Sequence, residues 1–349
     1  MRLGLNLGYL GTAGGGPPPD VSATLVAAAE RLGYAMVWTA EAFSSDAVSL
    51  LGWLAARTTG IGLGTAAMQI PARSPAMTAM TAATLDVLSG GRFHLGLGVS
   101  GPQVAEGWHG AGFDHPLART REYVDVVRMA LRRERLVHAG DYYAAGQGAA
   151  LRLGMRPVRA AVPVYLAAVG PRNIALAGEI ADGWLSVFFA PESAGDQLDA
   201  LRTGLRRAGR HRDDVDVAVT VPVAVGDDPA ECADRLRLHA AHFLGGMGSR
   251  EHNFYNRHAA RIGYAAAAAR VQRHYLDGDY RSAAAAVPLS FVERTCLVGQ
   301  VPAIAERIRA YADAGVRTLS VLPGGRDAGT GLRTLRTVAE AFDKSGVGD

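Results

Sequence analysis

Short apolar segments alternate with longer helical patterns along nearly the whole 349-residue chain. Most of the short segments are continuous apolar runs, which is typical of strands buried on both faces of a parallel sheet. Eight such units, with no linker between two halves, predict a (β/α)8 TIM barrel that forms a single domain over residues 1–349. A doubly wound open sheet is the alternative. The expected strands span residues 2–9, 36–39, 61–68, 93–99, 164–168, 184–188, 215–225 and 318–322.

Capping residues and helix breakers indicate where the helices between these strands begin and end. Ser22 is the expected cap of the first helix, and Ser89-Gly90-Gly91 is expected to end the third. A small hairpin is expected within residues 136–143. A mainly helical insertion is expected at about residues 228–300, before the last strand. The expected helices span residues 22–32, 46–57, 74–88, 119–132, 198–208, 303–314 and 332–344, with another beginning at residue 171.

Charge and composition exclude several classes of function. Lys344 is the only lysine among 36 basic residues, so mechanisms that need a lysine amine have almost no candidate. The net charge is only +3, and basic residues are scattered among acidic ones, which argues against nucleic-acid binding. A small anionic ligand held by a few arginines fits this balance better.

The cysteines and the apolar segments predict a soluble cytoplasmic protein. Cys232 and Cys296 are far apart in the sequence and lie outside any CxxC motif, so we expect free thiols and no disulfide. The apolar run at the N-terminus is too short and too polar for a signal peptide, and no segment reaches the length of a membrane helix.

Motifs for metal and hydrolase sites are incomplete. Glu106 and His109 form one Glu-x-x-His motif without its second half, and His239 and His242 lack partners at ligand spacing, so we expect no metal. No GxSxG sequence marks a hydrolase nucleophile. Residues 96–101 spell GxGxxG, but glycines and prolines follow in place of an uninterrupted helix, which argues against a dinucleotide site.

In a TIM barrel the chemistry lies at the carboxyl ends of the strands. Gly170, Pro171 and Arg172 follow the fifth expected strand and open a helix, an arrangement that can bind phosphate through backbone N–H groups. An ordinary strand-to-helix turn remains the alternative interpretation. The residues at the strand ends are Asn6, Glu41, Gln69, Ser100, Gly170 and Ser186.

Three segments, residues 32–41 (LGYAMVWTAE), 64–75 (GTAAMQIPARSP) and 85–98 (LDVLSGGRFHLGLG), together resemble the luciferase-like monooxygenase superfamily. Residues 99–103, 107–110 and 177–184 are similar to its coenzyme F420-dependent branch. The resemblance spans nearly the whole chain. It implies a bacterial luciferase-like TIM barrel, with the deazaflavin F420 bound at the carboxyl ends of the strands.

The resemblance also implies roles for individual residues. The Ala66–Ala67 peptide bond is expected to be cis and to lie behind the deazaflavin ring, with Glu41 at the ring edge. The turn at residues 170–172 is expected to take the phosphate. The implied cofactor-binding residues are Glu41, Ala66, Ala67, Gln69, Ser100, Gly101, Gly170, Pro171 and Arg172, the substrate is expected near Asn6, Tyr9 and Trp108, and Glu41 and His109 are the candidates for a catalytic role.

The resemblance implies an oxidoreductase that moves a hydride between F420 and a small organic substrate, with a homodimer or larger homo-oligomer expected. An FMN-dependent monooxygenase that uses reduced flavin and oxygen is the first alternative, and a barrel that binds cofactor without turnover is the second. Sugar-phosphate dehydrogenases of this branch have a His after the strand-two acid and a Glu after strand four. This chain has Ala42 and about Pro102 there, so their proton-transfer pair and substrate are not carried over.

Overall fold

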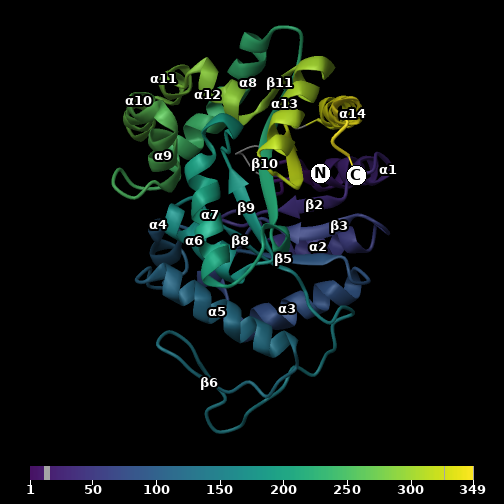
Figure 1. Cartoon of the computed structure of the whole chain (residues 1–349), viewed down its shortest axis with the longest axis vertical. Coiled ribbons are helices and arrows are strands. Elements are labelled where there is room, and N and C mark those ends of the chain that lie inside the picture. The colour runs from purple at the N-terminus through teal and green to yellow at the C-terminus, as the bar shows by residue number, and fades with distance from the viewer. Residues whose placement is uncertain (12–15, 326, 349) are drawn as a thin grey trace.

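The computed structural model describes residues 1–11, 16–325 and 327–348, and within them eight parallel strands close into a barrel (Figure 1). Strand β1 pairs with both β2 and β12, and β9 pairs with both β8 and β10, so the sheet closes on itself. The predicted TIM barrel is confirmed, and the open sheet is wrong. The barrel strands are β1 (Arg2–Asn6), β2 (Met36–Thr39), β3 (Gly62–Thr65), β5 (Phe93–Gly98), β8 (Val164–Ala167), β9 (Gly183–Val187), β10 (Asp216–Val225) and β12 (Thr318–Pro323).

Helices cover the outside of the barrel, and several begin earlier than the sequence analysis predicted. Helix α1 begins at Pro19, so Ser22 lies inside it and is not the cap. Proline at the first helical position supplies the helical φ angle without needing a hydrogen-bond acceptor, which also explains why α5 begins at Pro116. No helix in the described ranges is long and apolar enough to cross a membrane. The outer helices are α1 (Pro19–Arg31), α2 (Ala47–Ala55), α3 (Pro75–Leu88), α5 (Pro116–Leu131), α6 (Pro171–Ile180), α7 (Gly195–Arg207), α13 (Val301–Asp313) and α14 (Ala328–Ser345).

Two excursions extend from opposite ends of the molecule (Figure 1). The segment after β10 is mainly helical and packs on Phe188, Ala190 and Ala224, at the carboxyl ends of β9 and β10. The other excursion, between α5 and β8, contains the predicted hairpin, formed by β6 (His138–Ala139) and β7 (Ala144–Ala145). The first excursion consists of α8 (Pro229–Ala241), α9 (Phe254–Ala259), α10 (Ala265–Leu276), α11 (Tyr280–Ala285), α12 (Leu289–Thr295) and the short strand β11 (Leu297–Gly299).

The barrel interior is filled by a few large rings, for which glycines on neighbouring strands leave room. A Cβ at Gly64 would lie 2.3 Å from the Trp38 ring, and one at Gly183 would lie 2.1 Å from the Tyr165 ring. Trp38, Tyr165 and His94 contact one another edge to face. The rings fill space between these strands, and in a TIM barrel the ligand lies at the carboxyl ends of the strands.

Acid should destabilise the barrel through His94. Burial, together with the nearby charge of Arg159, lowers the pKa of His94 to about 4. The unfolded chain therefore binds a proton below pH ~6.5 that the folded chain rejects, so stability is full above that pH and falls towards pH 4. We expect a loss of about 2 kcal/mol between pH 6.5 and 5, from about 1.4 kcal/mol per pH unit. Urea unfolding of the wild type and His94→Gln at both pH values isolates this contribution, and equal pH dependence in the two proteins would contradict it.

Candidate active site

The strand pairing is interrupted where β3 ends, and the chain re-enters the sheet as β4 (Met68–Gln69). The peptide bond Ala66–Ala67 at this interruption is cis, as the resemblance implied. The Thr65 hydroxyl replaces the missing backbone partner of β5, because Oγ1 donates to the Gly96 carbonyl at 2.7 Å and accepts from the Gly96 N–H at 2.9 Å. The third predicted strand, residues 61–68, is therefore two strands separated by a bulge.

Small residues line the barrel mouth beside this bulge. A Cβ at Gly98 would lie 3.3 Å from the Ala67 Cβ and 3.7 Å from the Ala167 Cβ, so the ends of β5 and β8 and the bulge meet here. Gly98, Ala67 and Ala167 are all partly exposed. We call these residues, with Ala66, the small-residue bed. It offers a flat apolar surface that a planar ring can approach closely.

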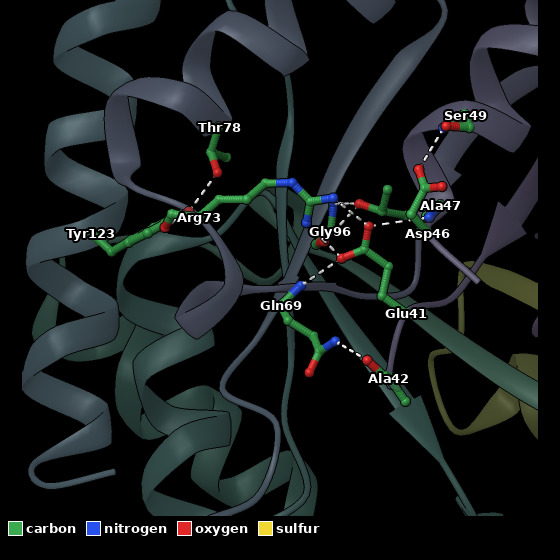
Figure 2. A network of polar contacts seen from close by, with 11 residues as sticks. Glu41, Ala42, Asp46, Ala47, Ser49, Gln69, Arg73, Thr78, Gly96 and Tyr123 are labelled. Carbon is green, nitrogen blue, oxygen red and sulfur yellow. Dashed lines mark hydrogen bonds and ion pairs between the residues drawn. The ribbon is translucent and has the colours of Figure 1, made fainter. Parts of the chain in front are cut away.

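Glu41 connects four segments at one side of the mouth (Figure 2). Arg73 donates to both carboxylate oxygens, at 2.7 and 2.9 Å, and the side chains are only 5% and 20% exposed for Glu41 and Arg73. The N–H groups of Ala47 and Gln69 donate to the same two oxygens, at 3.1 and 3.3 Å. Each carboxylate oxygen therefore accepts two hydrogen bonds, and these contacts tie the loop after β2 to Arg73, Gln69 and the start of α2.

The amide side chains of Gln69 and Asn6, both predicted site residues, also lie at the barrel mouth. Gln69 donates from Nε2 to the Ala42 carbonyl at 2.6 Å, while its buried Oε1 has no partner among the described residues. Asn6 is 7% exposed, donates to Thr220 Oγ1 at 3.1 Å and accepts from the Gly8 N–H at 2.8 Å. A buried oxygen without a donor is costly, so Gln69 Oε1 is an acceptor that a bound ligand can satisfy.

The segment after β5 carries four of the predicted site residues, and they differ in how exposed they are. Ser100 has a φ of 61°, and Gly101 caps the short helix α4 (Pro102–Gly107). Trp108, at the end of α4, is 66% exposed, and its contact with a substrate stays a prediction. His109 is turned inward, and its buried Nε2 has no partner in the described chain.

The turn from β8 into α6 leaves its first backbone donors free. Gly170 supplies no side-chain cap, and the N–H groups of Arg172 and Asn173 have no acceptor among the described residues. Arg172 is exposed, and Arg261 from the insertion donates to the Val169 carbonyl at 3.3 Å, one residue before Gly170. The α6 N-terminus thus has two arginines beside it, an arrangement suited to an anion. Arg261 could not be predicted as a neighbour of this turn, because 92 residues separate it from Val169.

An aromatic wall faces the strand ends from the insertion. Phe188 at the end of β9 contacts Phe243 and Tyr255, and Phe243 contacts His239. Burial raises the pKa of Tyr255, and nearby Tyr9 at the end of β1 raises it further. The predicted residue Tyr9 therefore lies close to this wall, although no sequence motif indicated its partners.

One of the predicted strand-end residues, Ser186, does not point into the barrel mouth. Ser186 is 2% exposed and follows Leu185, which packs with the barrel interior, so strand alternation turns Ser186 towards the helices and away from the mouth. Among the described residues, no three His, Cys, Asp or Glu side chains gather in a metal-binding arrangement.

Known proteins resemble the whole chain. The sequence pattern of the luciferase-like monooxygenases matches residues 3–318. A Mycobacterium tuberculosis protein assigned as a coenzyme F420-dependent oxidoreductase is 41% identical over 346 residues, 96% of this chain and 99% of that protein. An F420-dependent glucose-6-phosphate dehydrogenase of Kineococcus radiotolerans is 30% identical over 68% of this chain and 73% of its own. The structure of the coenzyme F420-dependent tetrahydromethanopterin reductase of Methanopyrus kandleri matches with a TM-score of 0.81 and 23% identity, over 97% of this chain and 98% of that one. The resemblance seen in the sequence is therefore confirmed, and the chain belongs to the luciferase-like monooxygenase family.

Proposed function

We propose that this protein is a coenzyme F420-dependent oxidoreductase that transfers a hydride between F420 and a small organic substrate. The observation that carries the proposal is the small-residue bed lying at the same barrel mouth as the free α6 N-terminus. One surface suits a planar ring and the other an anionic group. The F420-dependent relatives support the choice of this cofactor over other planar anionic molecules.

The residues at the mouth fit such a cofactor. The bed of Ala66, Ala67, Gly98 and Ala167 would support the ring, and Gln69 Oε1 is a buried acceptor without a donor in the described chain. The α6 N-terminus, with Arg172 and Arg261, would hold the phosphate. The cofactor supplies the hydride chemistry when bound, and the protein supplies binding, orientation and exclusion of water.

The substrate would lie between the ring and the aromatic wall. Tyr9, Phe243 and Tyr255 offer mostly apolar contacts there, which favours an apolar substrate with few polar groups. Of the two catalytic candidates, Glu41 is occupied by Arg73 and backbone donors, which leaves His109 as the group to exchange a proton with the substrate.

Arg172→Ala and Arg261→Ala should each weaken F420 binding by about tenfold, which corresponds to about 1.4 kcal/mol. The loss should shrink as salt rises, because the arginines act through exposed charge. Fluorescence titration of the purified protein with F420 at low and high salt measures both effects. Arg270→Ala is the matched control, since it removes an exposed arginine from α10 in the same insertion. Equal affinity in all four proteins would remove the phosphate assignment.

The same titration with FMN tests the proposal as a whole. Tight binding of F420 with weak FMN binding, together with hydride exchange in a screen of small alcohols and carbonyl compounds, is the expected result. A preference for FMN, with oxygen uptake in the presence of reduced flavin, would instead make the protein a flavin-dependent monooxygenase.

A further inference from the structure

A second basic surface lies far from the barrel mouth, at the amino end of β5. An open depression of about 480 Å³ is formed where the end of α5 meets the segment that returns to the barrel before β8. Val158 and Arg159 in this segment lie against Gly91, and Arg159 donates to the carbonyl of Phe93, the first residue of β5. The lining residues are Leu131, Arg132, Arg133, Arg152, Arg156, Pro157, Val158, Arg159 and Ala160. We call this surface the arginine depression.

Five of the nine lining residues are arginines, and none is acidic. The charges of two of these arginines are balanced by carboxylates that do not line the depression. Arg132 pairs with Glu134 at 2.6 Å, and Arg159 pairs with the buried Asp86 at 2.7 Å. The remaining three have no carboxylate partner among the described residues. The depression therefore carries an uncompensated charge of about +3.

These three guanidinium groups differ in how firmly they are held. Arg133 donates from Nε to the Leu153 carbonyl at 3.2 Å, so its side chain is fixed across the depression. The side chains of Arg152 and Arg156 are exposed and make no hydrogen bond or ion pair with the described chain. Their donors are free for a ligand, and like charges held close together favour binding of a counter-ion.

We propose that the arginine depression is a binding site for a multiply charged phosphate anion, such as a di- or triphosphate. Guanidinium groups match phosphate oxygens in pairs, and three of them supply enough charge for at least two phosphate groups. Leu131, Pro157 and Val158 add an apolar floor that an organic part of the ligand can contact. The site is separate from the anion position at the α6 N-terminus, because no lining residue is shared.

Calorimetric titration of the full-length protein with sodium tripolyphosphate tests the proposal. The titration uses the Arg172→Ala/Arg261→Ala variant as the background, because it lacks the two arginines of the anion position at the α6 N-terminus. In this background we expect one ion bound per chain, with an affinity that falls as NaCl rises from about 50 to about 300 mM. Arg152→Ala/Arg156→Ala should weaken binding by at least tenfold. The control, Arg135→Ala/Arg270→Ala, removes the same charge outside the depression and should change the affinity by less than twofold. Because the background lacks Arg172 and Arg261, the outcome does not depend on the proposed function.

Arg133→Gly provides a second variant that is expected to fold. Arg133 has a φ of 59°, in the left-handed region that glycine adopts more readily, so this change removes the guanidinium without opposing the backbone. It should also weaken tripolyphosphate binding. In the Arg172→Ala/Arg261→Ala background, an absence of binding heat, several ions per chain, or equal weakening in the depression and control variants would overturn the proposal. So would a change of oligomeric state in sedimentation without a change of affinity, since the depression would then be a subunit contact.

Discussion

Gly96→Ala should destabilise the barrel by about 4 kcal/mol or more. The added Cβ would lie 1.8 Å from the Thr65 carbonyl oxygen and 2.8 Å from Leu185 Cδ1. The first contact is with backbone, so neither a side-chain rotation nor a small shift relieves it. Moving β3 away from β5 would also break the two hydrogen bonds that Thr65 Oγ1 makes with Gly96. Thermal and urea unfolding of the variant measure the loss.

Gly98→Ala is the matched control for this prediction. It is the same substitution on the same strand and the same face, but its Cβ would meet only the Ala67 and Ala167 methyl carbons, at 3.3 and 3.7 Å. We expect a stability change below about 1 kcal/mol and weaker F420 binding, because the methyl group rises from the small-residue bed. A similar loss of stability in both variants would show that the clash with the Thr65 carbonyl does not determine how much Gly96→Ala destabilises the protein. Unchanged F420 affinity in Gly98→Ala would count against the bed.

The barrel could be predicted from local patterns, because each strand is a short apolar run and each strand–helix unit repeats the last. The predicted ends of helices and strands were less accurate than the predicted elements themselves, because individual residues at the ends decide where an element begins or stops. Pro19 and Pro116 start their helices three residues before the predicted positions, and the strand predicted over residues 61–68 is interrupted by the bulge. The apolar pattern of the sequence cannot reveal this bulge, because Ala66 and Ala67 are as apolar as the residues of an uninterrupted strand would be.

The candidate site was predicted less completely than the fold, for a physical reason. The rule that strand ends carry function identified Asn6, Glu41 and Gln69, which do lie at the mouth. It could not show what these side chains bind, because their partners come from other parts of the chain. Arg261 reaches Val169 from 92 residues away. The aromatic wall similarly depends on how the insertion folds over the barrel.

Arg73→Ala should destabilise the protein by about 3 kcal/mol, since it leaves the carboxylate of Glu41 buried without its cation. The effect should extend to the mouth, because Glu41 also holds the N–H groups of Ala47 and Gln69 (Figure 2). Glu41→Gln/Arg73→Met removes both charges at similar volume and should restore much of the stability. Urea unfolding of the wild type, Glu41→Gln, Arg73→Met and the double variant gives the coupling energy of the pair.

The same variants separate a structural role for Glu41 from a role at the ring edge. If the carboxylate only holds the loop, the double variant should recover F420 affinity together with stability. If Glu41 contacts the cofactor, the double variant should regain stability while F420 binding stays weak. The hydrogen bonds of Glu41 favour the first result, because Arg73 and two backbone donors already occupy both of its oxygens. F420 titration of the double variant therefore decides whether the loop or the cofactor is the partner for which this acid is needed.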